Sequence, residues 1–392
     1  MTHPSDDLRG SSSDKLRGKT VVLGVTGSIA AVESVKLARE LTRHGARVIP
    51  VMSPAACRIL HPDALWFATG RKPVTDLTGD VEHVRHCGRR ENQADMLLVA
   101  PCTANTLSKI ALGIDDTPVT TMATTAVGSG LPALLVPAMH AAMYDNPFVR
   151  DNLQRCREQG IHLADPRRAE GKAKMPEMED VVARVLRLLG KNDWAGKQVL
   201  VVGGATAEYL DPVRVLTNRS SGKMALALAA AAYQRGAEVE LWHHGLNPPA
   251  YLSSSTFTTS VDLVRRVQQA GRYHCIINCA AITDFTCRAQ ERKMASGQPL
   301  DLHLEPVPRI NPLLREHANL LVGFKLETDR ERALERAWET LHRDGLDYVV
   351  ANTTASLGGD DAQAWIIDRE KNTTPASGAK SQVADRLLDL IR

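Results

Sequence analysis

Aromatic side chains are scarce in this chain, where they make up 4% of 392 residues. Proteins that bind single-stranded nucleic acid stack bases on exposed aromatic rings, so this class of partner is not favoured. The chain also carries little net charge. Its 48 Lys and Arg residues nearly balance its 45 Asp and Glu residues, which leaves a net charge of +3. A nucleic acid footprint needs a larger basic excess. We therefore expect no nucleic acid partner.

The chain also lacks paired cysteines and long apolar runs. Its seven cysteines are odd in number, and none are spaced as CxxC. This favours reduced thiols over a disulfide framework or a zinc site. No apolar run reaches the length of about 18 residues that a membrane-crossing helix needs. Residues 1–18 are polar, without a signal-peptide core, so we predict a disordered tail on a cytoplasmic protein.

The length of 392 residues exceeds one ordinary core and favours two domains. Residues 19–53 read as an apolar strand, a small-residue turn, an amphipathic helix and a second strand, which is a βαβ unit. Residues 197–243 repeat this order after a polar link near 190–196. We predict an α/β protein with two doubly wound parallel-sheet domains, spanning 19–190 and 191–392.

Further apolar runs indicate strands that are covered on both faces. They span residues 96–102, 133–137, 274–281, 320–324, 348–352 and 364–368. In sheets of this kind, ligands bind beyond the carboxyl ends of the strands. The small polar residues at those ends are therefore the candidate site residues.

Three strand ends of the first domain carry glycine, serine or threonine and run into helices. Helix N-termini of this kind suit a phosphate. Each hydroxyl alone is more simply a helix cap, but three such ends in one domain favour one phosphorylated cofactor. The first turn is not GxGxxG, so a dinucleotide is not specifically indicated. The residues are Gly27, Ser28, Ile29, Ser53, Thr103, Asn105 and Thr106.

Histidines mark two further stretches of the first domain. Segment 79–87 carries His83 and His86, which are either surface histidines or include a general base. In the stretch LLVPAMHAAMYD, residues 134–145, a strand ends at a proline before Met139 and His140. This turn either packs in the hydrophobic core or borders a binding site.

In the second domain a long helix begins after Ser220, Ser221 and Gly222, with Lys223 in its first turn. Such a start suits a polyphosphate, but it is not the P-loop pattern GxxxxGK[ST]. Asn218 just before it is either a loop residue or a holder of a carboxylate or its activated ester. Asp284 at a strand end is either a helix cap or a contact to a base, ribose or metal.

In this order, the motifs resemble the bifunctional phosphopantothenoylcysteine decarboxylase/phosphopantothenate–cysteine ligase family of coenzyme A biosynthesis. The resemblance covers about residues 19–390. PAMH in place of the bacterial PAMN, and GDVEH with GIDDT, look closer to the archaeal branch. The motifs are TGSIAA, EHV, APCTANT, PAMHAAM, DPVRVLTNRSSGKMA, CAAITDF, INP and GFKLET.

The resemblance implies that residues 19–190 form a flavodoxin-like, FMN-dependent decarboxylase that converts 4′-phosphopantothenoylcysteine to 4′-phosphopantetheine. The seven strand-end residues above match flavin-binding positions, and His83 matches the catalytic histidine. PAMHAAM matches the motif for the substrate carboxylate, with His140 and Met143 as substrate contacts.

The resemblance implies that residues 191–392 form a Rossmann-like ligase. It would join 4′-phosphopantothenate to L-cysteine through an acyl-cytidylate made from CTP with Mg²⁺, and Asn218 matches the residue that holds this intermediate. Lys293 matches a lysine on a mobile flap that closes the site across a dimer. The other matching positions are Ser220, Ser221, Gly222, Lys223, Asp284, Asn311, Pro312 and Phe324.

Two departures from the family pattern stand out. Bacterial members carry a proton-donating cysteine near segment 167–175, which reads RRAEGKAKM here and contains none. Lys172, Lys174, His140 or a residue elsewhere could replace it. In the ligase half, two nucleotide-binding lysines align with Thr340 and Asp344, for which Arg343 or Lys325 could compensate. CTP is expected, but ATP stays open, and no metal ligands are assigned.

Other functions remain open at this stage. A nicotinamide oxidoreductase would need a GxGxxG turn, which neither half has, and a flavin-binding regulator would be expected to lack His83. A ligase with a structural flavin-binding half fits the missing cysteine. The resemblance also implies a homo-oligomer, with trimers of the first domain and dimers of the second joined into a dodecamer.

Overall fold

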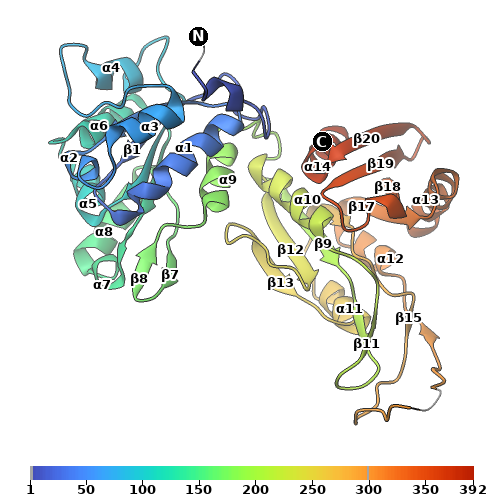
Figure 1. Ribbon diagram of the computed structural model, residues 1–392. Coiled ribbons are helices and arrows are strands. Elements are labelled where there is room, and N and C mark those ends of the chain that lie inside the picture. The colour runs from blue at the N-terminus through green and yellow to red at the C-terminus, as the bar shows by residue number, and fades with distance from the viewer. Residues whose placement is uncertain (1–2, 298–299) are drawn as a thin grey trace. The chain divides into compact units, whose positions relative to one another are not determined.

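The computed structural model describes residues 3–297 and 300–392. The chain divides into two compact units, Met1–Gly190 and Lys191–Arg392 (Figure 1). Each unit has its own central sheet. Its apolar strands are covered by helices, as continuous apolar runs predict.

Unit 1 contains a five-stranded parallel sheet in the order β2-β1-β3-β4-β6. This is the flavodoxin-like strand order, in which the chain reverses direction across the sheet between β1 and β3. The prediction of a flavodoxin-like α/β fold is therefore confirmed. The strands are β1 (Thr20–Val25), β2 (Arg47–Met52), β3 (Met96–Cys102), β4 (Ala133–Pro137) and β6 (His162–Leu163).

Helices cover both faces of this sheet. On one face α1, α3 and α9 pack on Leu23 and Leu98, and on the other α5, α6 and α8 pack on Val22 and Leu97. Successive strand residues point to opposite faces, so adjacent apolar residues feed both cores. The helices are η1 (Asp6–Leu8), η2 (Ile29–Glu33), α1 (Ser34–Arg43), α2 (Pro54–Cys57), α3 (Pro62–Thr69), α4 (Glu82–Cys87), α5 (Ala104–Leu112), α6 (Pro118–Ser129), α7 (Ala141–Tyr144), α8 (Pro147–Glu158) and α9 (Met178–Leu189).

Unit 1 also contains a second, small sheet. Its antiparallel strands run in the order β5-β8-β7 and comprise β5 (Met139–His140), β7 (Arg167–Ala169) and β8 (Lys172–Lys174). The hairpin β7–β8 thereby pairs with the PAMH segment. This pairing fixes two stretches that lie far apart in the sequence beside each other.

The N-terminal segment differs from the disordered tail predicted for residues 1–18. Over the described residues 3–18 it packs on the end of α1, where Leu16 is fully buried. Its backbone N–H groups donate to the last carbonyls of that helix, including Gly10 to Thr42 at 3.2 Å and Leu16 to His44 at 2.8 Å. Helix C-termini leave carbonyls without intrahelical partners. The polar composition of the segment conceals this docking role.

Unit 2 is built on an eight-stranded sheet in the order β13-β12-β9-β14-β17-β18-β19-β20. The first six strands are parallel in the Rossmann order, with β9 and β14 at its centre, so the Rossmann-like prediction is confirmed. The strands are β9 (Gln198–Gly204), β12 (Glu238–His244), β13 (Ser253–Thr256), β14 (Tyr273–Asn278), β17 (Ala318–Glu327), β18 (Tyr348–Thr353), β19 (Asp361–Asp368) and β20 (Thr373–Ala379).

The last two strands depart from the all-parallel expectation, because β19 and β20 are antiparallel to their neighbours. The connections 354–360 and 369–372 are too short for the crossover that a parallel strand needs. The remaining elements are β10 (Ala207–Tyr209), β11 (Val215–Thr217), α10 (Lys223–Gln234), α11 (Ser260–Gln268), β15 (Phe285–Thr286), β16 (Glu305–Pro306), α12 (Ile310–Arg315), α13 (Arg330–Asp344), η3 (Thr354–Ser356) and α14 (Lys380–Leu390).

Within residues 3–297 and 300–392, no helix combines the length and the apolar character needed to cross a bilayer. The cytoplasmic location expected from the cysteine usage stays a prediction.

Candidate functional site

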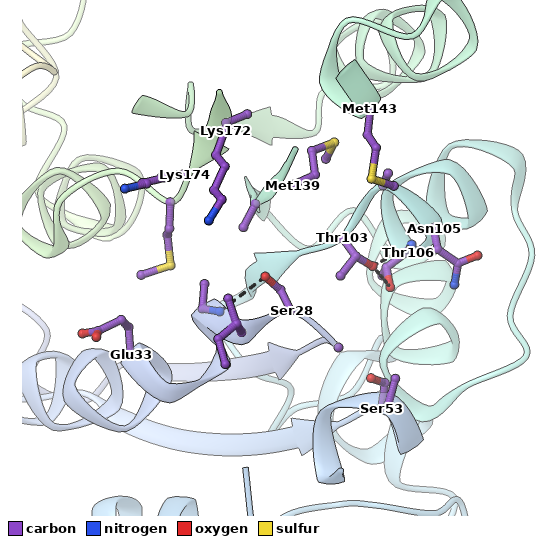
Figure 2. A pocket seen from close by; sticks show the side chains of 18 of the residues that line it. Ser28, Glu33, Ser53, Thr103, Asn105, Thr106, Met139, Met143, Lys172 and Lys174 are labelled. Carbon is purple, nitrogen blue, oxygen red and sulfur yellow. Dashed lines mark hydrogen bonds between the residues drawn. The ribbon is translucent and has the colours of Figure 1, made fainter. Parts of the chain in front are cut away.

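A cavity of about 1140 Å³ lies in unit 1 beyond the carboxyl ends of β1, β2, β3 and β4, and the hairpin β7–β8 borders it (Figure 2). Its position includes the crevice where the strand order reverses, which is the usual ligand site of this fold. The cavity brings together the predicted cofactor-binding and carboxylate-binding residues of this unit. They are Gly27, Ser28, Ile29, Ser53, Thr103, Asn105, Thr106, His140 and Met143.

Three hydroxyl side chains cap helices that begin at this cavity. Ser28 Oγ accepts from the Ala30 backbone at 3.4 Å, and Ser53 Oγ accepts from Ala56 at 3.2 Å. Thr103 Oγ1 accepts from the Thr106 backbone at 3.3 Å. The capping interpretation is thus correct for each residue. Because these three turns line one cavity, the backbone N–H groups that the caps leave unpaired can together bind an anion.

Thr26 belongs to the small-residue turn after the first strand and holds two of these turns together, a role that the sequence did not indicate. Its buried hydroxyl donates to the Pro101 carbonyl at 2.7 Å and accepts from the Thr103 backbone at 3.0 Å. Ser34 Oγ donates to the Ala100 carbonyl at 2.9 Å. These bonds tie the turn after β1 to the turn after β3. The only signal in the sequence was the position of Thr26 directly after an apolar strand.

Gly27 is required by a close approach between two turns. A Cβ atom at this position would lie 2.5 Å from Ala55 Cβ at the start of α2. Next to it, Ile29 leaves 77% of its surface exposed at the cavity. Figure 2 shows Met139 and Met143 on the far side of the same space. The cavity therefore combines polar helix starts with apolar surface, as cofactor sites do.

Basic residues outnumber acidic residues around the cavity, which suits a ligand with several negative charges. Most of these cations form ion pairs: Lys36 with Glu33 at 3.2 Å, Lys109 with Asp116 at 2.6 Å, Arg167 with Glu177 at 2.9 Å and Lys174 with Glu170 at 2.7 Å. Two others, Arg58 and Lys172, have no ion pair within the described part of the chain. Among the described residues that line the cavity there is no cysteine. Cys102 next to Thr103 is buried, and burial raises the pKa of its thiol.

His83 does not line the cavity. It lies on α4, and Figure 1 places α4 and the hairpin β7–β8 at opposite ends of unit 1. Its Nδ1 atom is buried and has no hydrogen-bond partner among the described residues. Burial lowers the pKa of the neighbouring His86, and Arg85 adds to this effect. The histidine predicted to be catalytic is thus separated from the predicted flavin residues of its own chain.

In unit 2 the predicted residues gather around the carboxyl ends of β9, β14 and β17. Asn218 follows β11, and its Nδ2 donates to the carbonyls of Ala281 at 3.3 Å and Ile282 at 3.0 Å. Those carbonyls belong to the segment after β14. Asn218 is therefore held at the point where the strand order of the Rossmann sheet reverses.

The helix α10 begins at Lys223 without a side-chain cap, in contrast to the capped helices of unit 1. Gly222 before it has φ 64° and would meet Leu246 if it carried a side chain. Ser220 Oγ accepts from the Gly222 backbone at 3.3 Å, and Ser221 is exposed. The first backbone N–H groups of α10 thus lack a side-chain acceptor and can bind an anion.

Lys223 contacts the loop between β18 and β19. Its Nζ donates to Asp360 Oδ1 at 2.6 Å and to the Gly358 carbonyl at 3.1 Å. The hydrogen bond from Lys223 lowers the pKa of Asp360, whose side chain is 88% exposed. An incoming phosphate would compete with this carboxylate for the ammonium group.

Asn311 and Pro312 lie in α12, where Asn311 is part of a hydrogen-bonded chain. Its Oδ1 accepts from Asn278 Nδ2 at 2.7 Å, and its Nδ2 donates to Asp344 Oδ2 at 3.0 Å. Arg343 Nε donates to Asp344 at 2.8 Å, which raises the pKa of Arg343. The bonds of Asn311 to neighbouring side chains were not foreseen from the sequence.

The remaining residues predicted for the nucleotide site of the ligase are more exposed to solvent. Asp284 is exposed, Phe324 and Lys325 are half-buried at the end of β17, and Lys325 pairs with Glu327 at 3.3 Å. Thr340 and Asp344, the positions where the family pattern has lysines, are buried in α13. They offer no cation to a nucleotide.

Lys293 is exposed on the long connection between β15 and β16. The next residue, Met294, donates its backbone N–H to Asp211 Oδ2 at 3.1 Å. Burial alone would raise the pKa of Asp211, but the hydrogen bonds from Val213, Met294 and Arg214 outweigh it and lower the pKa. This end of the connection is thus anchored. No group of His, Cys, Asp and Glu within residues 3–297 and 300–392 could hold a metal ion.

Comparison with known proteins finds a separate family match for each of the two units. Residues 9–190 match the family described as Flavoprotein, and residues 194–392 match the DNA/pantothenate metabolism flavoprotein C-terminal domain. The coenzyme A biosynthesis bifunctional protein CoaBC of Thermococcus kodakarensis is 44% identical, over 100% of this chain and 99% of its own length. The same protein of Methanocaldococcus jannaschii is 36% identical, over 100% of this chain and 98% of its own length.

Two solved structures are also similar. A C-terminal domain of a CoaBC bifunctional protein is 28% identical, with a TM-score of 0.44 over 51% of this chain and 96% of that chain. The FMN-dependent cysteine decarboxylase SpaF is 29% identical, with a TM-score of 0.38 over 43% of this chain and 94% of that chain.

Proposed function

The chain belongs to the family of coenzyme A biosynthesis bifunctional proteins, and we propose that its first unit is the decarboxylase and its second unit the ligase. Enzymes of this family join phosphopantothenate to cysteine and decarboxylate the phosphopantothenoylcysteine that results. This protein is accordingly a bifunctional ligase and decarboxylase of coenzyme A biosynthesis. The observation that carries the assignment of unit 1 is a cavity of about 1140 Å³ at which three helices begin.

We propose FMN as the ligand of that cavity. The helix starts at Ser28, Ser53 and Thr103 would bind the phosphate, and Ile29 would lie against the apolar ring system. The volume of about 1140 Å³ accommodates a flavin together with a substrate. A flavin supplies a reversible hydride acceptor, without which a carboxylate on an ordinary carbon does not leave. His140 can donate a hydrogen bond to that carboxylate, and Met143 borders the same space.

A second copy of the chain is proposed to supply His83. The residue lies on α4, away from the cavity of its own chain, and its buried Nδ1 lacks a partner among the described residues. A histidine can serve as a general base near neutral pH. We propose trimers of unit 1, in which α4 of one copy faces the cavity of the next. Dimers of unit 2, closed by the Lys293 flap, would join these trimers into a dodecamer.

For unit 2 we propose that CTP activates 4′-phosphopantothenate as an acyl-cytidylate, which the amine of cysteine then attacks. The uncapped start of α10 and the ammonium of Lys223 would bind phosphate groups, and Asn218 would hold the intermediate. Mg²⁺ would neutralise the triphosphate. Asp284, Asn311, Pro312, Phe324 and Lys325 would border the nucleotide.

One observation favours a second candidate function, a ligase whose unit 1 binds flavin without catalysis. No cysteine lines the cavity within residues 3–297 and 300–392, and segment 167–175 lacks the cysteine that the resemblance gives to bacterial members as the acid. The two functions differ in one product, because only a decarboxylase releases carbon dioxide.

The nucleotide assignment is tested with the purified protein, 4′-phosphopantothenate, cysteine and Mg²⁺, supplied with either CTP or ATP. We expect cysteine-dependent product formation with pyrophosphate release, faster with CTP than with ATP. Equal rates would contradict the choice of CTP. Absence of pyrophosphate with both nucleotides would contradict the acyl-nucleotide route.

Replacing Gly27 by valine is expected to weaken FMN binding by about five- to 160-fold. The new side chain would collide with Ala55, and overpacking of this kind costs about 1–3 kcal/mol. Quenching of flavin fluorescence, titrated against the flavin-free protein, measures the dissociation constant. Gly128→Val is the matched control, because a Cβ at the exposed Gly128 in α6 meets nothing within 4 Å. Equal affinity in the two variants would contradict the assignment of the cavity to FMN.

A further inference from the structure

The decarboxylation that we propose for unit 1 needs an acid, and the inference below rests on that proposed function. The FMN proposed for this cavity would accept a hydride from the sulfur-bearing carbon of the cysteine moiety before this step and would return it afterwards. When carbon dioxide leaves the oxidised substrate, a thioaldehyde, the electron pair of the broken C–C bond stays on the substrate as an enethiolate. The carbon that carried the carboxylate must then gain a proton. An acid that supplies it has to reach into the same cavity as the substrate carboxylate.

Few of the ionisable residues that line the cavity could act as this acid. The ionisable lining residues are Glu33, Lys36, Arg58, Lys109, His140, Arg167, Lys172, Lys174 and Glu177. Arginine does not give up its proton in proteins, which excludes Arg58 and Arg167. An acid must also be free to turn toward the substrate, which disfavours residues that are already held in ion pairs.

Ion pairs occupy five of the remaining residues. Lys36 binds Glu33 at 3.2 Å, Lys109 binds Asp116 at 2.6 Å, Lys174 binds Glu170 at 2.7 Å, and Glu177 binds Arg167 at 2.9 Å. Two groups are left, His140 and Lys172. Both lie on the small sheet that borders the cavity.

His140 on β5 and Lys172 on β8 are direct cross-strand neighbours. Residues opposite each other in an antiparallel pair place their side chains on the same face. Within the described part of the chain, Lys172 has no ion pair or side-chain hydrogen bond. In Figure 2 the Lys172 side chain extends from the hairpin toward the cavity, whereas Lys174 turns to the side.

We propose that Lys172 is the catalytic acid that protonates the enethiolate, while its neighbour His140 binds the substrate carboxylate before it leaves. In this step an N–H bond of the Lys172 ammonium breaks, and a C–H bond forms at the carbon that has lost carbon dioxide. The lysine becomes a neutral amine. Because Lys172 is exposed at the cavity rim, water returns its proton before the next cycle.

The test uses the FMN-loaded full-length protein and the substitution Lys172→Gln. Carbon dioxide is expected to be released about once per subunit and then to stop. Formation of 4′-phosphopantetheine should fall by about 10²-fold or more. Mass spectrometry should find an enethiol that is two hydrogen atoms lighter than 4′-phosphopantetheine. FMN affinity, measured by fluorescence titration, should match the wild type, and Lys172→Cys should restore part of the product.

Lys72→Gln is the matched control, because it removes the same charge from an exposed position of unit 1 outside the cavity lining and should leave product formation near wild type. Wild-type product formation by Lys172→Gln would overturn the proposal. Loss of carbon dioxide release in that variant would also overturn it, since Lys172 would then act in binding. Accumulation of the enethiol in His140→Asn instead would make His140 the acid. A wild-type protein that releases no carbon dioxide would refute the proposed function itself.

Discussion

Replacing His83 by asparagine is expected to abolish carbon dioxide release and to leave pyrophosphate release at the wild-type level. Asparagine keeps a similar size and can still form hydrogen bonds, but it cannot take up a proton. Loss of a general acid or base reduces a rate by about 10²- to 10⁴-fold. The measurement supplies 4′-phosphopantothenoylcysteine for one assay, and 4′-phosphopantothenate, cysteine and CTP for the other. His61→Asn is the control, because His61 is an exposed cap of α3 outside the cavity lining.

Because His83 lies outside the cavity of its own chain, we also expect the two kinds of inactive subunit to complement each other. If a neighbouring copy supplies the histidine, His83→Asn subunits still have an intact FMN cavity, and Gly27→Val subunits still have His83. Unfolding and refolding the two variants together should therefore restore part of the carbon dioxide release. His83→Asn refolded alone should stay inactive, and Gly27→Val refolded alone should stay nearly inactive when FMN is kept below the dissociation constant of that variant. A mixture as inactive as its components would place His83 and the cavity in the same subunit, or would remove His83 from the reaction.

Replacing Asn218 by alanine is expected to abolish pyrophosphate release and to spare decarboxylation of supplied 4′-phosphopantothenoylcysteine. The amide precedes α10 in the chain and donates to the carbonyls of Ala281 and Ile282. Removing a polar group that stabilises a reacting intermediate reduces a turnover rate by about 10²- to 10³-fold. Asn372→Ala is the control, because Asn372 binds Asp368 in the turn between β19 and β20.

The two variants together test the division of labour. His83→Asn should lose one activity and Asn218→Ala the other. If both folded variants lost both activities, the assignment of one reaction to each unit would be wrong.

The fold could be predicted from the sequence because its strands are continuous apolar runs that alternate with amphipathic helices. Once the strands were located, the residues at their ends could be predicted to form a candidate site. The carboxyl ends of parallel strands share one edge of a sheet, so Ser28, Ser53 and Thr103 had to lie near each other. The strand orders and the direction of β19 depend on connections across the sheet, which local patterns do not record.

Contacts between distant segments account for the features that the sequence concealed. Leu16 is buried because the N-terminal segment meets the carbonyls at the end of α1. Asn311 is held by Asn278 and Asp344, which come from two other elements. The pairing of Lys172 with His140 likewise joins two strands that lie far apart in the sequence. None of these partners could be selected from spacing alone.

The central claim is that one chain carries both reactions in sequence, and the ratio of two products tests it most directly. The purified protein is incubated with FMN, freed of unbound flavin and supplied with 4′-phosphopantothenate, cysteine, CTP and Mg²⁺, and pyrophosphate and carbon dioxide are counted at completion. We expect a yellow protein and one carbon dioxide for each pyrophosphate. Pyrophosphate without carbon dioxide would contradict the account by leaving a ligase alone, and a colourless protein that releases neither would contradict it entirely.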